Sequence, residues 1–177
     1  IKRSNGYLLV NSQLSHGSTF TVYFPAYKGE SNYHHEKSGK KSSTTLTGYE
    51  HIMLVEDEAG IRNTIKMILE AKGYKVSEYD DGEKALGSFS KNQKQFDLII
   101  TDMTMPKMTG YELGIKILNL RKEIPIILCT GYSETINKEE CEKAGFKKFL
   151  QKPVESKTLL IEIRKALDEE KVSSNRY

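Results

Sequence analysis

The stretch DLIITDMTMP, residues 97–106, combines an apolar segment with a single acid at its end. The run Leu-Ile-Ile at 98–100 suits a strand that is buried on both faces of a sheet. The run ends at Asp102, and the segment breaks at Pro106. Ligands of open α/β sheets bind at the carboxyl ends of the strands, so Asp102 lies where chemistry is expected.

Further apolar runs alternate with helix-like stretches along the chain. The five expected strands are residues 51–56, 75–79, 97–102, 125–129 and 147–151. Helical spacing of apolar residues is found at Ile61, Ile65, Ile68 and Leu69, at Leu113, Ile117, Leu118 and Leu120, and at Leu159, Leu160, Ile163 and Leu167. Gly73 and Gly145 lie where helices should end. The alternation predicts an α/β fold, a doubly wound five-stranded parallel sheet of flavodoxin-like order 2-1-3-4-5 with helices on both faces.

The composition is that of an ordinary globular protein. The 177 residues are 37% hydrophobic and 29% charged. No apolar run approaches the roughly 18 residues that a membrane span needs, and no signal-like segment opens the sequence. We therefore expect a cytoplasmic segment without membrane contact. Cys129 and Cys141 lack zinc-site spacing, so both are expected to be reduced thiols.

The net charge of +3 is unevenly placed along the chain. Residues 1–50 hold 6 basic and 3 acidic residues, whereas from residue 51 onward 21 basic residues balance 21 acidic ones. A nucleic-acid-binding face usually requires a basic patch on the folded domain. The sequence therefore predicts no direct binding to nucleic acid.

A change of composition divides the chain. Residues 28–49 contain one aliphatic residue, Leu46, amid Ser, Thr, Gly and Lys, and such a segment cannot repay the entropy of ordering. The predicted segments are residues 1–27, which hold a hairpin, 28–49, a flexible linker, 50–171, the main domain, and 172–177, a tail.

The hairpin is expected over residues 7–24. Its second strand alternates apolar and polar side chains, with Phe20, Val22 and Phe24 set against Thr19, Thr21 and Tyr23. An isolated two-stranded hairpin is marginal in water, and its open edges can pair with another chain. We therefore expect homo-association through residues 7–24, in which the hairpin pairs with that of a second copy or packs on a receiver.

Polar residues follow the expected strands at the point where each one ends. The first strand ends in Glu56 and Asp57, the third in Asp102 and the fourth at Thr130, and Lys152 follows the fifth. In the predicted order, the first and third strands are neighbours, so three carboxylates converge on one pocket. Mg²⁺ is the natural counterion for such a cluster of oxygen ligands. With the lysine and threonine opposite, the set suits a phosphoryl group.

Four motifs in this order resemble a response-regulator receiver domain over roughly residues 50–170. The motifs are LVEDE at 54–58, DLIITDMTMPKMTG at 97–110, ILCTG at 127–131 and FLQKP at 149–153. Each motif alone is weakly specific, whereas the ordered set is highly specific. The resemblance implies a module of a two-component His-to-Asp phosphorelay.

The resemblance also implies a role for each acid. Asp102 would accept the phosphoryl group from phosphohistidine. Asp57 and Asp102 would bind Mg²⁺ together with the backbone carbonyl of Thr104, and Glu56 would act through metal-bound water. Glu56 stands where the family more often has Asp. Autophosphatase activity would be the only catalysis besides phosphorylation itself.

The remaining motif residues would assist the transfer and report it. Lys152 would neutralise phosphoryl charge, and Thr130 would donate its hydroxyl to the phosphoryl group. That movement would draw Phe149 inward as a two-position switch, at a position where many relatives have Tyr. Thr104 and Tyr132 stand where the family tunes the lifetime of the aspartyl phosphate. Neither is an amide or acid that would position water, so slow autophosphatase activity is expected.

The first segment carries a second resemblance. Residues 1–25 are similar to the last strands of a histidine-kinase ATPase domain, with GSTF at 17–20 matching the end of its final glycine-rich box. The implied parent is a hybrid sensor histidine kinase, which could be bound to a membrane elsewhere. The implied partner is a phosphohistidine-bearing kinase or phosphotransfer domain. No cofactor-binding residues other than the Mg²⁺ ligands are expected, because the motifs for Mg-ATP are missing.

Two other functions fit part of the pattern. A Mg²⁺-dependent phosphatase of the haloacid dehalogenase type would use DMT at 102–104, but that family needs a second Asp where this chain has Thr104 and places its nucleophile after the first strand. A flavodoxin-like cofactor binder shares the sheet order, but the acidic loop at 56–58 would repel a flavin phosphate.

Overall fold

The computed structural model describes residues 6–25, 46–131 and 138–174. The chain forms two compact units, residues 1–43 and 44–177, which are described separately. Within the described residues, no helix has both the length and the apolar character that crossing a membrane requires.

The first unit is the expected antiparallel hairpin. Strand β1 (Tyr7–Gln13) pairs with β2 (Gly17–Tyr23), so that Val10 lies opposite Phe20. Gly17 has a positive φ of 94° at the end of the turn, a conformation that glycine adopts without a steric penalty. Both strands are exposed along their whole length, so the described residues of this unit, 6–25, form no core of their own.

The second unit contains the predicted sheet. Its strands are β3 (His51–Val55), β4 (Lys75–Tyr79), β5 (Leu98–Asp102), β6 (Ile126–Thr130) and β7 (Lys148–Gln151). All neighbouring pairs are parallel and the order is β4-β3-β5-β6-β7, which confirms the predicted 2-1-3-4-5 arrangement. Each strand lies within one residue of its expected bounds. Every residue of the three central strands β3, β5 and β6 is buried, as a sheet covered on both faces requires.

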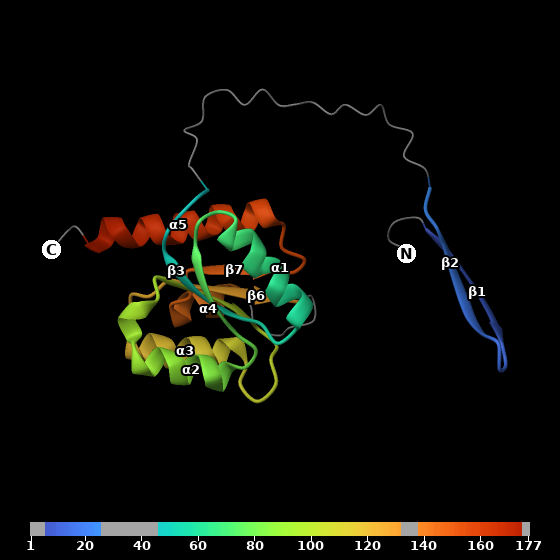
Figure 1. Ribbon diagram of the computed structural model, residues 1–177, viewed down its shortest axis with the longest axis horizontal. Helices are drawn as coiled ribbons and strands as arrows, with labels where there is room; N and C mark the ends of the chain where they lie inside the picture. The colour runs from blue at the N-terminus through green and yellow to red at the C-terminus, as the bar shows by residue number, and fades with distance from the viewer. Residues whose placement is uncertain (1–5, 26–45, 132–137, 175–177) are drawn as a thin grey trace, which may run out of the picture. The chain divides into compact units, whose positions relative to one another are not determined.

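Helices cover both faces of this sheet. They are α1 (Ala59–Glu70), α2 (Gly82–Lys91), the short 3₁₀ helix η2 (Gln93–Gln95), α3 (Gly110–Leu120), α4 (Lys138–Ala144) and α5 (Ser156–Ser174). Helices α1 and α5 pack on one face, and α2, α3 and α4 pack on the other (Figure 1). Helices α1 and α4 are followed by Gly73 and Gly145, whose φ values of 91° and 99° confirm the expected stops.

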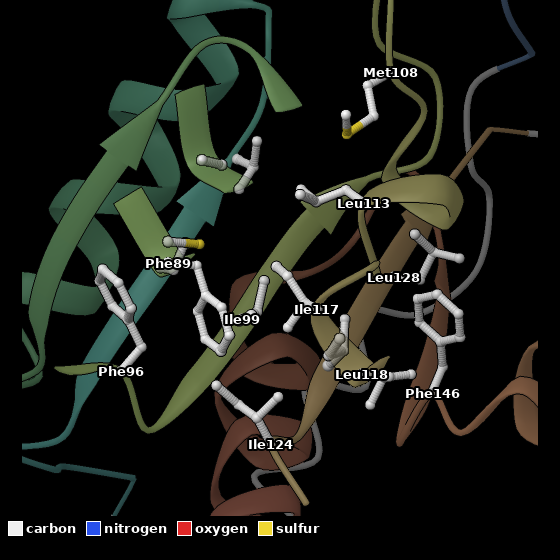
Figure 2. Packing of buried hydrophobic residues seen from close by; sticks show 14 of the residues in the cluster. Phe89, Phe96, Ile99, Met108, Leu113, Ile117, Leu118, Ile124, Leu128 and Phe146 are labelled. Atoms are coloured by element: carbon white, nitrogen blue, oxygen red, sulfur yellow. The ribbon is translucent and has the colours of Figure 1, made fainter. Parts of the chain in front are cut away.

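Alternation along β5 builds one core on each face. Ile99 contributes to the cluster under α2 and α3, where Phe89 and Phe96 stack with ring centroids 6.2 Å apart (Figure 2). Leu98 and Ile100 point to the opposite cluster under α1 and α5. Packing in the two cores fixes the position of β5 within the sheet, and therefore the position of Asp102 at its end.

The ends of the second unit differ in detail from the expected segments. Leu46, near the end of the predicted linker, packs partly buried against the core under α1 and α5, and the Gly48 amide donates to the Lys72 carbonyl at 3.0 Å. Helix α5 continues to Ser174, so it includes the first residues of the predicted tail. Residues 28–45 of the linker lie outside the described residues.

A buried ion pair ties the start of β3 to α5. The Arg164 guanidinium donates to both carboxylate oxygens of Glu50 at 3.0 Å and to Asp168 at 2.8 Å. The Glu50 side chain is only 4% exposed. We predict that Arg164→Ala lowers the free energy of unfolding in urea by about 3 kcal/mol, because it leaves a carboxylate buried without its counter-charge. The exposed neighbour Lys165 is the control, since Lys165→Ala removes only a surface pair. Equal stability of the two variants would contradict the account.

Candidate functional site

The expected polar residues meet at the carboxyl edge of the sheet. Backbone hydrogen bonds fix the positions of the strand ends relative to one another. The Met103 amide donates to the Cys129 carbonyl and the Lys152 amide donates to the Thr130 carbonyl, both at 2.7 Å. The Glu56 amide donates to the Tyr79 carbonyl at 3.1 Å. These bonds run one residue beyond the strands, so the residues that follow them are held by the same ladder.

Three acids form a cluster at this edge. Glu56, Asp57 and Asp102 each offer one carboxylate oxygen, and these oxygens lie within 4.8 Å of one another. Glu56 and Asp102 are buried, whereas Asp57 is exposed. Hard divalent cations prefer such carboxylate oxygens, and Mg²⁺ usually keeps several waters beside one or two carboxylates. The donor set therefore fits Mg²⁺, with one open side toward solvent.

Lys152 faces this cluster from the end of β7. Its ammonium nitrogen lies 2.6 Å from Asp102 Oδ1 and 2.8 Å from Glu56 Oε2. Burial alone would lower the pKa of Lys152, but the hydrogen bonds to Asp102 and Glu56 outweigh it and raise that pKa. The lysine therefore carries its charge at neutral pH. The peptide bond between Lys152 and Pro153 is cis.

The pKa of Glu56 is also raised. Burial is the largest cause, and the hydrogen bond from Lys152 opposes it, while the nearby charge of Asp102 raises it further. The raised pKa of Glu56 and the raised pKa of Lys152 are consistent, because a partly buried site crowded with negative charge favours bound protons and cations alike. The same field favours a metal ion at the cluster.

Thr130 and Phe149 lie on adjacent strands. Thr130 is the last residue of β6 and is only 2% exposed, and its hydroxyl donates to the Gly131 carbonyl at 3.2 Å. Phe149 lies opposite Leu128 in the pairing of β6 with β7, and it packs half-buried against the core under α2 and α3. Thr104 is exposed in the loop after β5, and Tyr132 lies outside the described residues.

The loop that follows Asp102 is anchored by residues that the sequence reasoning did not single out. The Gly110 amide donates to the Met103 carbonyl at 2.9 Å, and a β-carbon at Gly110 would collide with the Asp102 carbonyl oxygen. Thr109 and Glu112 form a capping box at the start of α3. The sequence TGYE at 109–112 carries this signature and could have revealed it.

The methionines and cysteines near the site are structural. Met103, Met105 and Met108 belong to the core under α2 and α3. Cys129 is buried beneath the site, and desolvation raises the pKa of its thiol to about 12, so the thiol does not ionise at neutral pH. Cys141 is also buried and free, which confirms the expected reduced thiols.

A cavity opens beside Lys152, between α1 and the start of α5. Its volume is about 630 Å³. Apolar side chains form most of its wall, and they include Ile61, Ile65, Ile68, Val154 and Leu159. Glu58, Thr64 and Ser156 supply its polar groups. The site therefore adjoins an apolar hollow as well as open solvent.

Comparisons with known proteins agree with this fold. The family model described as the response regulator receiver domain matches residues 52–164. The chain belongs to this family. Crystal structures of receiver domain proteins from Clostridium thermocellum and Methanospirillum hungatei JF-1 are 31% and 32% identical to it. They cover 70% and 71% of this chain, with 98% and 99% of their own chains aligned and TM-scores of 0.67 and 0.65.

Curated relatives of this receiver domain include a response regulator and a sensor kinase. The two-component response regulator ORR5 of rice is 34% identical over 110 residues, which are 61% of this chain and 81% of that protein. Sensor kinase CckA of Brucella abortus is 27% identical over 176 residues, which are 96% of this chain and 18% of that kinase. The chain thus spans less than a fifth of the kinase. The family match also decides against the phosphatase and flavodoxin-like alternatives.

Proposed function

We propose that this receiver domain accepts a phosphoryl group from phosphohistidine on Asp102 in a His-to-Asp phosphorelay. The observation that carries the proposal is the charged contact of 2.6 Å between Lys152 and Asp102, at the edge where three carboxylates converge. A lone acid at the end of a strand could serve as a turn former. An acid paired with a half-buried lysine and grouped with two further acids is better suited to phosphoryl transfer.

The residues divide the chemistry among them. A carboxylate oxygen of Asp102 attacks the phosphorus, so that a new P–O bond forms while the P–N bond of phosphohistidine breaks and the imidazole leaves. Lys152 neutralises charge on the phosphoryl oxygens, and the Thr130 hydroxyl donates to one of them. Mg²⁺, held by Asp57, Asp102 and the Thr104 carbonyl, would supply additional positive charge at the same oxygens.

The phosphodonor is a phosphohistidine-bearing kinase or phosphotransfer domain. The cavity beside Lys152 supports this proposal, because its apolar wall from α1 and α5 offers a surface on which such a partner could pack. A donor seated there brings its imidazole toward the edge that holds Asp102. Such a relay draws its phosphoryl groups from ATP, so the proposal places this segment in the cytoplasm.

Phosphorylation would then change the conformation of the domain through movements of Thr130 and Phe149. The inward shift of Thr130 toward the phosphoryl group vacates space at the strand end, and Phe149 moves into it. Phe149 is half-buried on the neighbouring strand, which is compatible with two positions. Because phenylalanine has no hydroxyl, the switch would change the exposed apolar area of this face rather than a hydrogen bond.

The parent protein in this proposal is a hybrid sensor histidine kinase. Support comes from the match to sensor kinase CckA, which extends over 96% of this chain and therefore beyond the receiver domain. Residues 1–27 would be the last hairpin of the ATPase domain, 28–49 the linker, 50–171 the receiver and 172–177 the tail. The hairpin at β1 and β2, exposed on both strands, fits a piece of a larger sheet.

Intact mass spectrometry tests the proposed function. Phosphoramidate with Mg²⁺ should add the mass of one phosphoryl group to the protein, and no adduct should form when Mg²⁺ is chelated before the phosphoramidate is added. Turnover of p-nitrophenyl phosphate without an adduct would instead support a phosphatase. A yellow protein carrying bound flavin would support a cofactor binder. Either of these two results would contradict the proposal.

The aspartyl phosphate should decay slowly. Neither Thr104 nor Tyr132 can orient a water for attack as an amide or acid would. We predict that Thr104→Asn, which introduces an amide beside Asp102, speeds decay of the adduct about tenfold or more. The measurement is the adduct fraction against time after removal of the donor. Loss of the wild-type adduct within seconds would show that this reading of Thr104 is wrong.

The hairpin should associate and the receiver should not. Leu8, Val10, Phe20 and Val22 lie on one face of the two strands and are all exposed, so that face can be covered by a second copy. Deleting residues 1–45 is expected to give a monomer in light scattering that still accepts phosphate. A full-length Val10→Ser/Phe20→Ser variant is the control and should also be monomeric. A deletion variant that remains dimeric would assign the interface to the receiver.

A further inference from the structure

We propose that Arg62 is a positioning residue for the metal site, because it holds the backbone of the acidic loop, residues 56–58, so that Asp57 faces the ion. The inference deepens the proposed function and rests on it, since it takes Asp57 as a ligand of Mg²⁺. Arg62 belongs to α1 and lies outside the acid cluster itself. It would act on the ion only through the loop that it binds.

Arg62 binds the carbonyls of three consecutive residues. Its backbone amide donates to the carbonyl of Glu58, the N-cap residue of α1, at 3.0 Å. Its side chain turns back along the loop, where Nη1 donates to the Glu56 carbonyl at 2.7 Å and to the Asp57 carbonyl at 3.2 Å. The two N–H groups of Nη1 allow one nitrogen to bind both oxygens. The whole acidic loop is therefore tied to one residue of the helix.

The guanidinium is itself held by its surroundings. Helix α1 packs on the sheet through Ile65, Ile68 and Leu69. Glu78 of β4 lies 3.9 Å from Arg62 Nε, on the side of the guanidinium that does not bind the loop. The Arg62 side chain is only 16% exposed, so water screens its contacts less than those of a surface pair. The loop is therefore bound to a cation with little freedom to move.

Asp57 depends on this support because its own side chain is exposed. Packing does not fix an exposed carboxylate, so the position of its backbone decides where it points. Mg²⁺ demands near-ideal octahedral geometry, with ligands at about 2.1 Å. Hydrogen bonds that orient metal ligands from outside the coordination sphere commonly account for about 10- to 100-fold in metal affinity. The hydrogen bonds from Arg62 to the loop are of this kind.

The charge of Arg62 and its hydrogen bonds act on Mg²⁺ in opposite directions. A guanidinium close to the acids repels a second cation, so its charge alone would weaken Mg²⁺ binding. Its hydrogen bonds hold the loop in place and would strengthen Mg²⁺ binding. The direction in which the Kd for Mg²⁺ changes when the guanidinium is removed therefore distinguishes the two effects.

Arg62→Met removes the guanidinium and keeps an apolar stem. Titration of the full chain with Mg²⁺ alone, followed by amide chemical shifts, gives the Kd without a phosphodonor. We expect this Kd to rise about tenfold. In metal-free protein, hydrogen exchange of the Glu56 amide, which is bound to the Tyr79 carbonyl, should become faster relative to the amides of β5.

The phosphorylation rate provides a second measurement of the same variant. With phosphoramidate as donor, the Mg²⁺ concentration that gives the half-maximal rate should rise about tenfold in Arg62→Met. The rate at saturating Mg²⁺ should stay within about twofold of the wild type, because the ion then restores the position of its ligand.

Lys66→Met is the matched control. Lys66 lies one turn further along α1 and pairs with the same acid, Glu78, at 3.1 Å. Its substitution should change neither the Kd for Mg²⁺ nor the exchange of the Glu56 amide. Arg62→Lys keeps the charge but loses the fork of donors, so its Kd should rise about threefold. Arg62→Lys alone decides the test if Arg62→Met does not fold.

A Kd for Mg²⁺ that is unchanged or lower in Arg62→Met, or unchanged in Arg62→Lys, would overturn the proposal. Arg62 would then affect the ion through its charge alone or not at all. Failure of the proposed function would look different, because wild-type protein would then form no adduct with phosphoramidate and Mg²⁺.

Discussion

Asp57→Ala should abolish Mg²⁺ binding and lower the rate of phosphorylation by more than about 10³-fold. Asp57 is the exposed member of the acid cluster, so it is the ligand that a hydrated ion meets first. Without it, the remaining acids, Glu56 and Asp102, are buried and both are paired with Lys152. The measurement is the rate of adduct formation with phosphoramidate across a Mg²⁺ titration.

The same substitution should leave the fold intact. Removing one of three clustered anions relieves repulsion, so the free energy of unfolding without Mg²⁺ should be unchanged or higher. Glu58→Ala removes another exposed acid from the same loop and should affect neither metal binding nor phosphorylation by phosphoramidate. A normal rate of phosphorylation in Asp57→Ala would show that the metal assignment is wrong.

Lys152→Ala should lower the rate of phosphorylation about 10²- to 10³-fold, because a preorganised positive charge is lost where charge develops. It should also lower the free energy of unfolding by about 2 to 3 kcal/mol in the absence of Mg²⁺. Glu56 and Asp102 have side chains only 4% and 7% exposed, and both lose their counter-charge. Mg²⁺ should restore part of the stability, because it binds the folded state only.

Lys157→Ala is the matched control for this variant, since Lys157 lies exposed at the start of α5. It should change neither the rate nor the stability. Lys152→Ala and Asp57→Ala should both impair phosphorylation but differ in stability without Mg²⁺. The free energy of unfolding should fall in Lys152→Ala, whereas it should stay unchanged or rise in Asp57→Ala. A Lys152→Ala variant as stable as the wild type would show that the lysine does not compensate the buried acids.

The sheet and the placement of its polar ends could be predicted because both depend on local patterns. A buried parallel strand such as β5 is a short continuous apolar run, and the rule that active groups gather at the carboxyl edge then places Asp102. Helices α1, α3 and α5 were marked by apolar spacing. Helices α2 and α4 were not, because α2 offers only Ala85, Leu86 and Phe89 as sizeable apolar contacts and α4 is mostly charged.

The contacts within the site could not be predicted in the same way. Lys152 and Glu56 are 96 residues apart, and Arg164 and Glu50 are 114 residues apart. Which acid a lysine reaches depends on side-chain length and on the relative positions of the two strand ends that carry the residues. A local sequence pattern does not predict those relative positions. The sequence therefore indicated the members of the site, whereas the bridge from Lys152 to Glu56 became visible only in the folded chain.

The central claim is that Asp102 carries the phosphoryl group. Borohydride reduction converts an aspartyl phosphate to homoserine, and peptide mass spectrometry then locates that residue. After phosphorylation of the full chain with phosphoramidate and Mg²⁺, we expect homoserine at position 102 alone, and no adduct on Asp102→Asn. Homoserine at position 57, or an undiminished adduct on Asp102→Asn, would contradict the account.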